Sequence, residues 1–268
     1  MKKIIIWVIL IIFLGFLLLF LISEVKGEVL IFNSVSYKPL FQTLKQNGFS
    51  EKEIAKIFSD KRIVLYPQIL KKKGKGLDYF DPRFGLLAEE SIARGKDAFI
   101  KEGSVLRKTK EIFGVPEEIL VSLYRLETDF GRYLGDYLVF NSLLTFSILE
   151  NRRSSWARQE LVSLLLLSRQ NGFDHLAIKG SWAGAFGLLQ FLPSSFLNYA
   201  LDGDGDGRVD LFVFPDAAFS AANYLKRHGW RRDYDIERNK KAIFSYNPCP
   251  NYVKAIVVYA KAIGFKES

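Results

Sequence analysis

The sequence predicts a mainly α-helical exported domain that follows an N-terminal transmembrane helix. Three observations support this fold class. Residues 4–22 form an apolar run, most segments after Leu86 place hydrophobic residues at helical spacing, and strand patterns are few and short. The chain has 268 residues, 49% of them hydrophobic, so one sizeable core can form behind the apolar run.

The apolar run is typical of a membrane anchor. As a helix, residues 4–22 would span roughly 30 Å of hydrocarbon. Lys2 and Lys3 precede the run, which places them in the cytoplasm and everything after Ser23 outside. A cleaved signal peptide is the alternative, but its apolar stretch is usually about 7–15 residues long and ends at small residues. We therefore expect residues 1–27 to form a retained single-pass anchor.

Charge and cysteine content limit the partners and the covalent structure. The net charge of +9 favours polyanionic partners, and export excludes nucleic acid from these. Anionic lipid and the peptide carboxylates of a cell wall remain. The only cysteine, Cys249, can form no internal disulfide and lies too far from the anchor to accept a lipid there. We interpret it as a small buried filler rather than as a nucleophile.

Residues 28–85 predict a small helical region and a connection, and residues 86–268 predict the main domain. Ser50 and Glu53 form a capping box that opens a short helix, and residues 66–85 are typical of an irregular connection. Weak strand patterns occur at residues 29–32 and 209–213. The helical pattern predicts helices over residues 87–112, 116–130, 141–149, 155–170, 192–200, 216–228, 238–245 and 251–263.

Glu127 is a carboxylate on the edge of an apolar helix face. Pro116 suits the first turn of this helix and Gly131 its end, and the buried stripe comprises Ile119, Leu120, Leu123, Leu126 and Phe130. Burial raises a carboxyl pKa, which a general acid needs near neutral pH. An ion pair of Glu127 with Arg125 or Arg132 is the structural alternative.

No second carboxylate accompanies Glu127 in the sequence. Glycoside cleavage by the usual route needs two carboxylates, and Asp129 and Asp136 are the nearby candidates. On a helix Asp129 would project about 200° away from Glu127, so we do not expect the two to share a cleft.

Two further segments combine small or turn-forming residues with polar side chains. Residues 180–190 place three glycines and two alanines ahead of Gln190, a composition that permits close backbone approach to a ligand or to another helix. Tyr246 and Asn247 precede Pro248 and Pro250, which place both side chains on a turn where they can hydrogen-bond a sugar or an acid.

The acidic segment at residues 202–207 predicts a calcium loop. Asp202, Asp204 and Asp206 supply oxygen ligands at loop positions 1, 3 and 5, and Gly207 is the glycine at position 6. Arg208 would add a backbone carbonyl. Position 12 is a valine instead of the usual glutamate, so we expect a lengthened EF-hand-like loop that Asp216 closes. An Asp- and Gly-rich surface turn is the alternative, and the expected calcium role is structural.

Taken together, these residues resemble the lytic murein transglycosylase B family. The resemblance runs from about Leu86 to Gly264 and rests on LETDFGR at 126–132, on KGSWAG and QFLPSS between 179 and 195, and on the acidic loop followed by ANY at 222–224 and HGW at 228–230. It implies a lysozyme-like catalytic domain on the periplasmic side of the bacterial inner membrane. Peptidoglycan glycan strands would be the substrate, and no organic cofactor is implied.

The same resemblance implies roles for individual residues. Glu127 would be the single catalytic acid and base that cleaves the bond between MurNAc and GlcNAc and leaves 1,6-anhydroMurNAc ends. Arg152 and Arg153 match a pair that faces the peptide stem, with a solvated helix start as the alternative. The positions that match residues around the sugar are Ser181, Gln190, Phe191, Tyr224, Tyr246, Asn247 and Tyr252.

Two departures from the family pattern affect the cleft. The segment between Trp230 and Tyr246 is shorter than in typical members, and Cys249 stands where serine is common. Two other functions remain open from the sequence. One is a hydrolytic muramidase of the same fold, and the other is a non-catalytic, calcium-stabilised wall-binding module.

Overall fold

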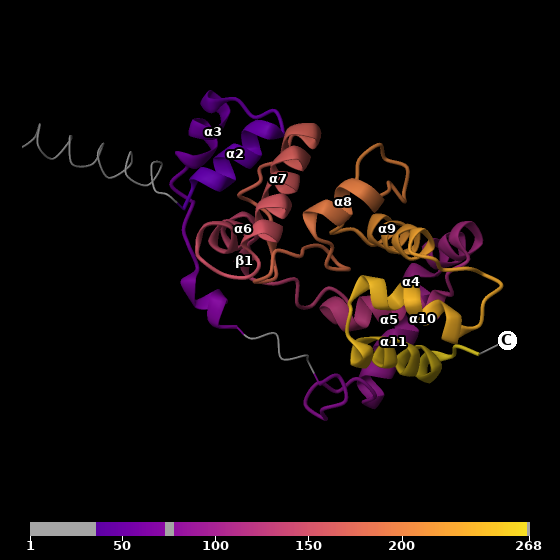
Figure 1. Ribbon diagram of the computed structural model, residues 1–268. Helices are drawn as coiled ribbons and strands as arrows, with labels where there is room; N and C mark the ends of the chain where they lie inside the picture. The colour runs from indigo at the N-terminus through magenta and orange to yellow at the C-terminus, as the bar shows by residue number, and fades with distance from the viewer. Residues whose placement is uncertain (1–35, 73–77, 267–268) are drawn as a thin grey trace, which may run out of the picture. The chain divides into compact units, whose positions relative to one another are not determined.

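The computed structural model describes residues 36–72 and 78–266. The chain divides into two compact units, the first ending at Phe58 and the second starting at Ser59, and Figure 1 shows helices as the main element of both. The predicted anchor at residues 1–27 and the predicted strand at 29–32 lie outside the described residues. No helix within those described ranges is long and apolar enough to cross a membrane.

The first unit contains α2 (Lys38–Gln46) and α3 (Glu51–Phe58). The predicted capping box is confirmed, because the Ser50 hydroxyl accepts from the Glu53 N–H at 3.2 Å and the Glu53 carboxylate accepts from the Ser50 N–H at 2.7 Å. The Phe58 ring packs edge-on against the ring of Phe41 at 5.0 Å. This aromatic contact joins the two helices.

In the second unit the predicted helices are confirmed to within about two residues at most ends. A short 3₁₀ helix, η1 (Pro67–Lys71), interrupts the predicted irregular connection. The α-helices are α4 (Glu89–Phe113), α5 (Glu117–Thr128), α6 (Val139–Ile148), α7 (Ser154–Asn171), α8 (Pro193–Tyr199), α9 (Phe214–Arg227), α10 (Ile236–Tyr246) and α11 (Pro250–Ile263).

Helix α5 lies at the centre of a helical layer in the second unit. It packs against α4, α9 and α11, and Figure 1 shows these helices gathered together. Ile119, Leu120, Val121 and Leu123 are all fully buried, and so is Ser122. The helix is therefore buried on all sides, whereas the sequence predicted a one-sided apolar stripe. A residue on α5 needs a partner within the protein if it is polar.

The predicted strand at residues 209–213 is wrong. This segment forms a turn before α9, because the Asp210 N–H is bonded to Asp216 and Val213 caps the helix. The strands observed are β1 (Tyr137–Leu138) and β2 (Lys179–Gly180), an antiparallel pair with Tyr137 opposite Gly180. They are too short for an alternating pattern to show in the sequence.

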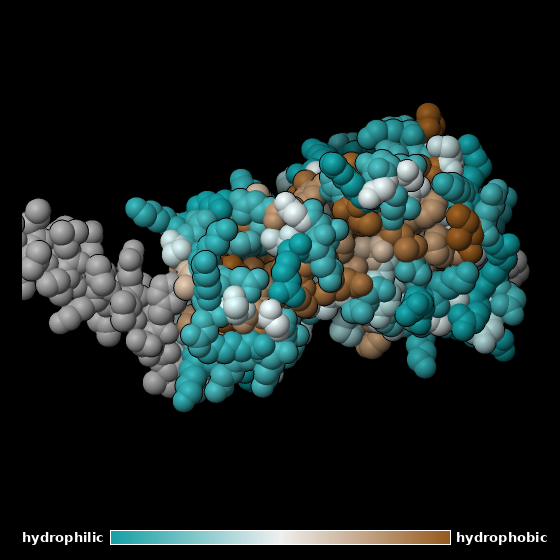
Figure 2. All heavy atoms as spheres, turned by 90° about the horizontal axis from the view of Figure 1, so that it is seen from above, coloured by the Kyte–Doolittle hydropathy of each residue, from teal (hydrophilic) through white to brown (hydrophobic). Residues whose placement is uncertain are grey.

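A second layer is formed by α6 and α7, which pack closely on each other. At one end of this pair, Phe146 and Ala157 form a buried cluster with Ile69 of η1. Partly exposed aromatic rings pack around these three residues. In Figure 2, hydrophilic residues cover most of the visible surface, with hydrophobic residues showing between them.

Candidate active site

Glu127 lies in the last turn of α5, one residue before the helix ends. Asp129, Phe130 and Gly131 follow with φ values of 48°, 61° and 82°, so three successive residues adopt the left-handed conformation. Helix α5 therefore ends before Gly131, earlier than predicted. Left-handed backbone at non-glycine residues costs free energy and persists only where surrounding contacts hold it.

Asp129 is held at this turn by three arginines. Its carboxylate lies 3.1 Å from the Arg94 guanidinium, 3.2 Å from that of Arg125 and 3.4 Å from that of Arg132. Asp129 is thereby fully engaged with cations. The expectation that it does not act beside Glu127 fits this arrangement, and the ion pairs anchor the turn that follows Glu127.

Glu127 itself has a tyrosine as its partner. The Tyr252 hydroxyl of α11 donates to the Glu127 carboxylate at 2.6 Å. Arg125 and Arg132, the arginines expected as alternative partners, bind Asp129 instead. Burial raises the pKa of Glu127 to about 7, and the hydrogen bond from Tyr252 opposes part of this rise. The carboxyl is therefore poised to gain or lose a proton near neutral pH.

Glu127 is also accessible. Its side chain is partly exposed, and it lines a cavity of about 540 Å³ together with Phe84, Arg94 and Tyr133. Glu160, another buried carboxylate of this unit, accepts from the N–H and hydroxyl of Ser194 at the start of α8. Glu160 therefore has a structural role in the protein.

Tyrosines surround the carboxylate. The Tyr246 hydroxyl donates to the Leu189 carbonyl at 2.6 Å, and burial together with the Glu127 charge raises the pKa of Tyr246 and of Tyr252 well above the usual range. Tyr79 packs edge-on against Tyr252 at 5.7 Å, and burial and the Glu127 charge raise its pKa as well. The sequence analysis missed Tyr79, because it falls in an irregular segment without periodicity.

Tyr246 also forms an aromatic group with two further predicted residues. The rings of Tyr224 and Tyr246 meet at 5.0 Å, and Phe191 packs edge-on against Tyr224 at 6.0 Å and Tyr246 at 5.9 Å. Phe191 is 3% exposed and Tyr252 is 1% exposed. These two side chains therefore hold their neighbours in place, while Tyr224 and Tyr246 retain some exposed surface.

The glycine-rich segment folds tightly on itself and next to β1. A Cβ at Gly180 would lie 2.1 Å from the Ala185 carbonyl oxygen, and one at Gly135 would lie 2.1 Å from that of Gly180. The close approach at these two glycines is thus to neighbouring backbone, whereas the sequence left open a ligand or another helix. The turn presents Ser181, whose hydroxyl accepts from the Ala185 N–H at 3.0 Å.

Gln190 ends this segment with a φ of 52°, and its side-chain amide donates to the Gly187 and Leu134 carbonyls at 3.0 and 3.3 Å. The partly exposed amide thus has the partners that its apolar neighbours require. Asn247 caps the end of α10 and is partly exposed. Cys249 is also partly exposed, so the expectation of a buried filler is wrong.

Arg152 and Arg153 lie exposed just before α7. The Arg153 guanidinium lies 5.8 Å from the centre of the Trp182 ring. Trp182 follows Ser181 directly, so Arg153 contacts the glycine-rich turn. This places one member of the arginine pair beside the predicted sugar-binding residues.

The acidic loop brings three carboxylates together. Oxygens of Asp202, Asp204 and Asp216 all lie within 4.8 Å of one another, while Asp206 is not part of the group. Asp216 is 1% exposed and accepts from the N–H groups of Gly203 and Asp210. Burial raises the pKa of Asp216, against the effect of these donors. Asp216 thus lies near two of the predicted ligands, and its closure of a calcium loop stays a prediction.

A Tyr252→Phe substitution is expected to raise the pKa of Glu127 by about one unit. The hydrogen bond from Tyr252 stabilises the charged carboxylate. Hydrogen bonds to charged groups contribute about 1.5–3 kcal/mol, and we expect a smaller contribution here because Glu127 is partly exposed. An NMR titration of the labelled glutamate carboxyl carbons measures the change. Tyr259→Phe is the matched control, since the Tyr259 hydroxyl donates to the Ser91 carbonyl. An unchanged or lowered pKa in Tyr252→Phe would contradict the expectation.

Comparison with known proteins gives a consistent result. Residues 34–239 match the family described as "Transglycosylase SLT domain". A membrane-bound lytic murein transglycosylase B from Escherichia coli K12 is 38% identical over 144 residues, which are 54% of this chain and 40% of that protein. The chain thus aligns with less than half the length of this relative.

Two solved structures share the fold. The catenated lytic transglycosylase SltB1 from Pseudomonas aeruginosa has a TM-score of 0.77 at 27% identity, covering 86% of this chain and 97% of that one. The E. coli lytic transglycosylase Slt35 in complex with calcium has a TM-score of 0.77 at 24% identity, covering 86% and 93%. The predicted family resemblance and mainly helical fold are confirmed.

Proposed function

Because the chain belongs to the transglycosylase SLT domain family, we propose that it is a lytic transglycosylase that cleaves the β-1,4 bond between MurNAc and GlcNAc in peptidoglycan. The observation that carries the proposal is the Glu127 carboxyl, whose pKa of about 7 suits it to both donate and accept a proton. The neighbouring Asp129 is bound to three arginines and is unsuited to act as a second catalytic carboxylate.

A single acid and base suffices for this reaction. Protonated Glu127 gives its proton to the glycosidic oxygen as the bond from that oxygen to MurNAc C1 breaks. The 2-acetamido group of MurNAc stabilises the positive centre at C1, in the role that a second carboxylate has in most glycosidases. The Glu127 carboxylate then removes the proton of the C6 hydroxyl, and O6 bonds to C1. The products are a GlcNAc end and a 1,6-anhydroMurNAc end, without consumption of water.

The proposed substrate contacts follow from the placement of side chains. Ser181, Tyr224, Tyr246 and Asn247 retain exposed surface for hydrogen bonds and ring contacts with the sugars. Gln190 is partly exposed as well. Phe191 and Tyr252 act as supports, Tyr252 by holding the Glu127 carboxyl at 2.6 Å. Arg152 and Arg153 face the peptide stem.

Calcium is proposed as a structural ion in the acidic loop. Asp202, Asp204 and Asp216 fit such an ion, because three carboxylates whose oxygens lie within 4.8 Å repel one another unless a cation neutralises them. Gly203 supports the same loop, since a Cβ there would lie 2.3 Å from the Pro215 carbonyl oxygen. The ion would tie the loop to the start of α9. The related Slt35 structure was solved with calcium.

The proposed location is the periplasmic side of the bacterial inner membrane. The apolar run at residues 4–22 and the lysines that precede it support a single-pass anchor. The E. coli relative is likewise a membrane-bound protein.

Product analysis tests the proposed function. The full-length chain, purified in detergent, is incubated with isolated peptidoglycan, and the released muropeptides are identified by mass spectrometry. We expect products with 1,6-anhydro ends, which weigh one water less than hydrolytic products. Reducing ends would identify a hydrolytic muramidase. No release of fragments, with retained wall binding, would identify a non-catalytic binding module.

A further inference from the structure

Lys72 directly follows η1 and ends the segment of residues 59–72, here called the η1 connection. It lies against an aromatic residue of the same second unit. Its ammonium group donates to the Tyr137 hydroxyl at 3.0 Å and lies 4.8 Å from the centre of the ring. Tyr137 belongs to β1 and pairs with Gly180, which directly precedes Ser181. Lys72 therefore reaches the strand pair from which the glycine-rich turn begins.

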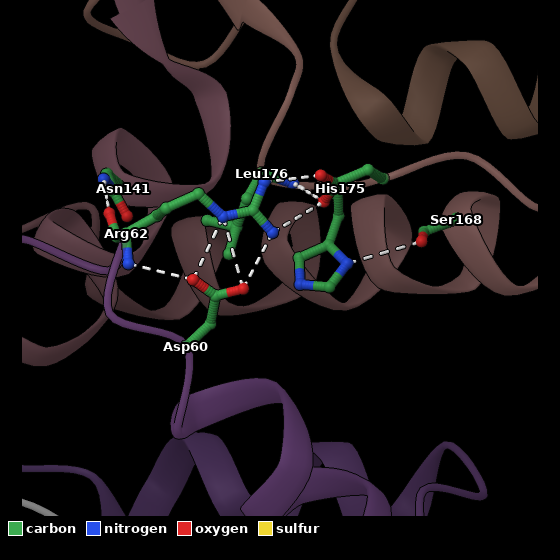
Figure 3. Close-up of polar contacts among 7 residues, drawn as sticks. Asp60, Arg62, Asn141, Ser168, His175 and Leu176 are labelled. Carbon is green, nitrogen blue, oxygen red and sulfur yellow. Dashed lines mark hydrogen bonds and ion pairs between the residues drawn. The ribbon is translucent and has the colours of Figure 1, made fainter.

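The connection that carries Lys72 is firmly attached. Figure 3 shows the Arg62 guanidinium bound to the Asp60 carboxylate and the Asn141 amide donating to the Arg62 carbonyl, at 3.0 Å. The guanidinium also pairs with the Asp174 carboxylate. Farther along, the Tyr66 N–H donates to the Thr145 hydroxyl at 2.9 Å. These contacts fix residues 60–66 on α6 and on the segment after α7.

The η1 helix is also held in place, because one of its residues is buried in a cluster that aromatic rings surround. Ile69 is fully buried with Phe146 and Ala157, and Tyr66, Tyr137, Trp156 and Trp182 pack around these three residues while remaining partly exposed. Tyr66 and Tyr137 meet edge-on at 5.3 Å. Lys72 on Tyr137 and Arg153 on Trp182 thus lie against two rings that pack on the same buried group.

Some cations of the second unit pair with acidic side chains and others do not. Arg62, Arg83, Arg94, Arg125 and Arg132 all pair with aspartates or glutamates. Within residues 36–72 and 78–266, Lys72, Arg152 and Arg153 form no ion pair. Positive charge beside aromatic rings and without an acidic partner is complementary to an anionic ligand with apolar faces.

We propose that Lys72 binds a carboxylate of the substrate's peptide stem, which makes the η1 connection part of the substrate-binding surface. The inference rests on the proposed function, because it takes peptidoglycan as the substrate. Within a glycan strand the sugars with amide-linked stems carry no charge, so the anionic groups are the carboxylates of the peptide. Tyr137 holds the ammonium in place, which reduces the side-chain entropy that binding would otherwise cost.

The test compares the binding of two soluble fragments of equal size. One is a GlcNAc-MurNAc oligomer with intact stem peptides, and the other is the same oligomer with its peptide carboxylates converted to amides. Dissociation constants are measured at low ionic strength with the full-length Glu127→Gln chain, so that cleavage does not interfere. We expect Lys72→Gln in this chain to weaken binding of the intact fragment about fivefold and to leave the amidated fragment unaffected.

Lys71→Gln is the matched control. Lys71 is the adjacent exposed lysine and its replacement removes the same charge, so its variant should bind both fragments like the parent. Equal weakening for both fragments, or no weakening for either, would overturn the role of Lys72 while leaving the proposed function intact. A Glu127→Gln chain that binds neither fragment, together with an unsubstituted chain that does not cleave peptidoglycan, would overturn both.

Discussion

A Glu127→Gln substitution is expected to slow the cleavage of glycan strands about a thousandfold. Glutamine has nearly the shape of glutamate but can neither give nor take the proton, and positioned acid-base groups contribute about 10²–10⁴-fold. In the parent chain the rate should fall as the pH rises above about 7, where Glu127 loses the proton that it must donate. The rate of muropeptide release over a pH series measures both effects.

Glu118→Gln is the control for this substitution. Glu118 lies in the first turn of α5, so its replacement removes a carboxylate from the same helix at a distance from Tyr252. It should keep most of the activity and the same pH profile. Residual cleavage within tenfold of the parent in Glu127→Gln would show that another group carries the proton.

The Glu127→Gln substitution is also expected to change the thermal stability of the protein. The pKa of Glu127 is higher in the folded chain than in the unfolded chain, so its protonation favours folding at low pH, and this contribution is lost as the pH rises through about 7. Glu127→Gln should therefore melt at a higher temperature than the parent at pH 8. The difference should shrink toward pH 5, as thermal unfolding at the two values can test.

Removal of calcium is expected to lower the melting temperature of the chain by about 5–10 °C. An ion present at a hundredfold excess over its dissociation constant stabilises the folded state by about 2.7 kcal/mol, and 1 kcal/mol corresponds to about 2–4 °C in a domain of this size. The measurement is thermal unfolding in calcium and after chelation, with magnesium added back for comparison.

Two variants locate the calcium effect. Asp216→Asn should abolish the response to calcium, because Asp216 is the buried member of the carboxylate group. Asp210→Asn should retain it, since Asp210 is exposed and its carboxylate accepts from the Phe212 N–H. A parent chain that melts at the same temperature with and without calcium would contradict the proposed site.

Much of the fold was predictable because the relevant information is local. Helices α4 to α11 follow from hydrophobic spacing, and the capping box at Ser50 and Glu53 follows from two side chains three residues apart. The strands were not predictable. A two-residue strand carries no alternating pattern, and Tyr137 finds its partner Gly180 only when α6 and α7 have packed between them.

Some residues of the candidate site were likewise predictable from local sequence, and others were not. Glu127 stood out in the sequence because a charged residue in an apolar segment is costly unless it has a function or a partner, and the acidic loop stood out because its ligands are close in the chain. The partners of Glu127 could not be assigned from the local sequence pattern. Arg125 and Arg132 were plausible partners of Glu127 by spacing, yet both bind Asp129 once the backbone turns left-handed after α5.

The sequence by itself thus determined the helices, the position of Glu127 on a helix and the acidic loop at residues 202–207. Each of these features depends on residues within a few positions of one another. Only the tertiary structure decided what surrounds Glu127. Tyr252 lies 125 residues away and reaches the carboxylate because α11 packs on α5, and Tyr79 joins them from an irregular segment. The burial that raises the pKa of Glu127 to about 7 comes from this packing, which no local pattern encodes.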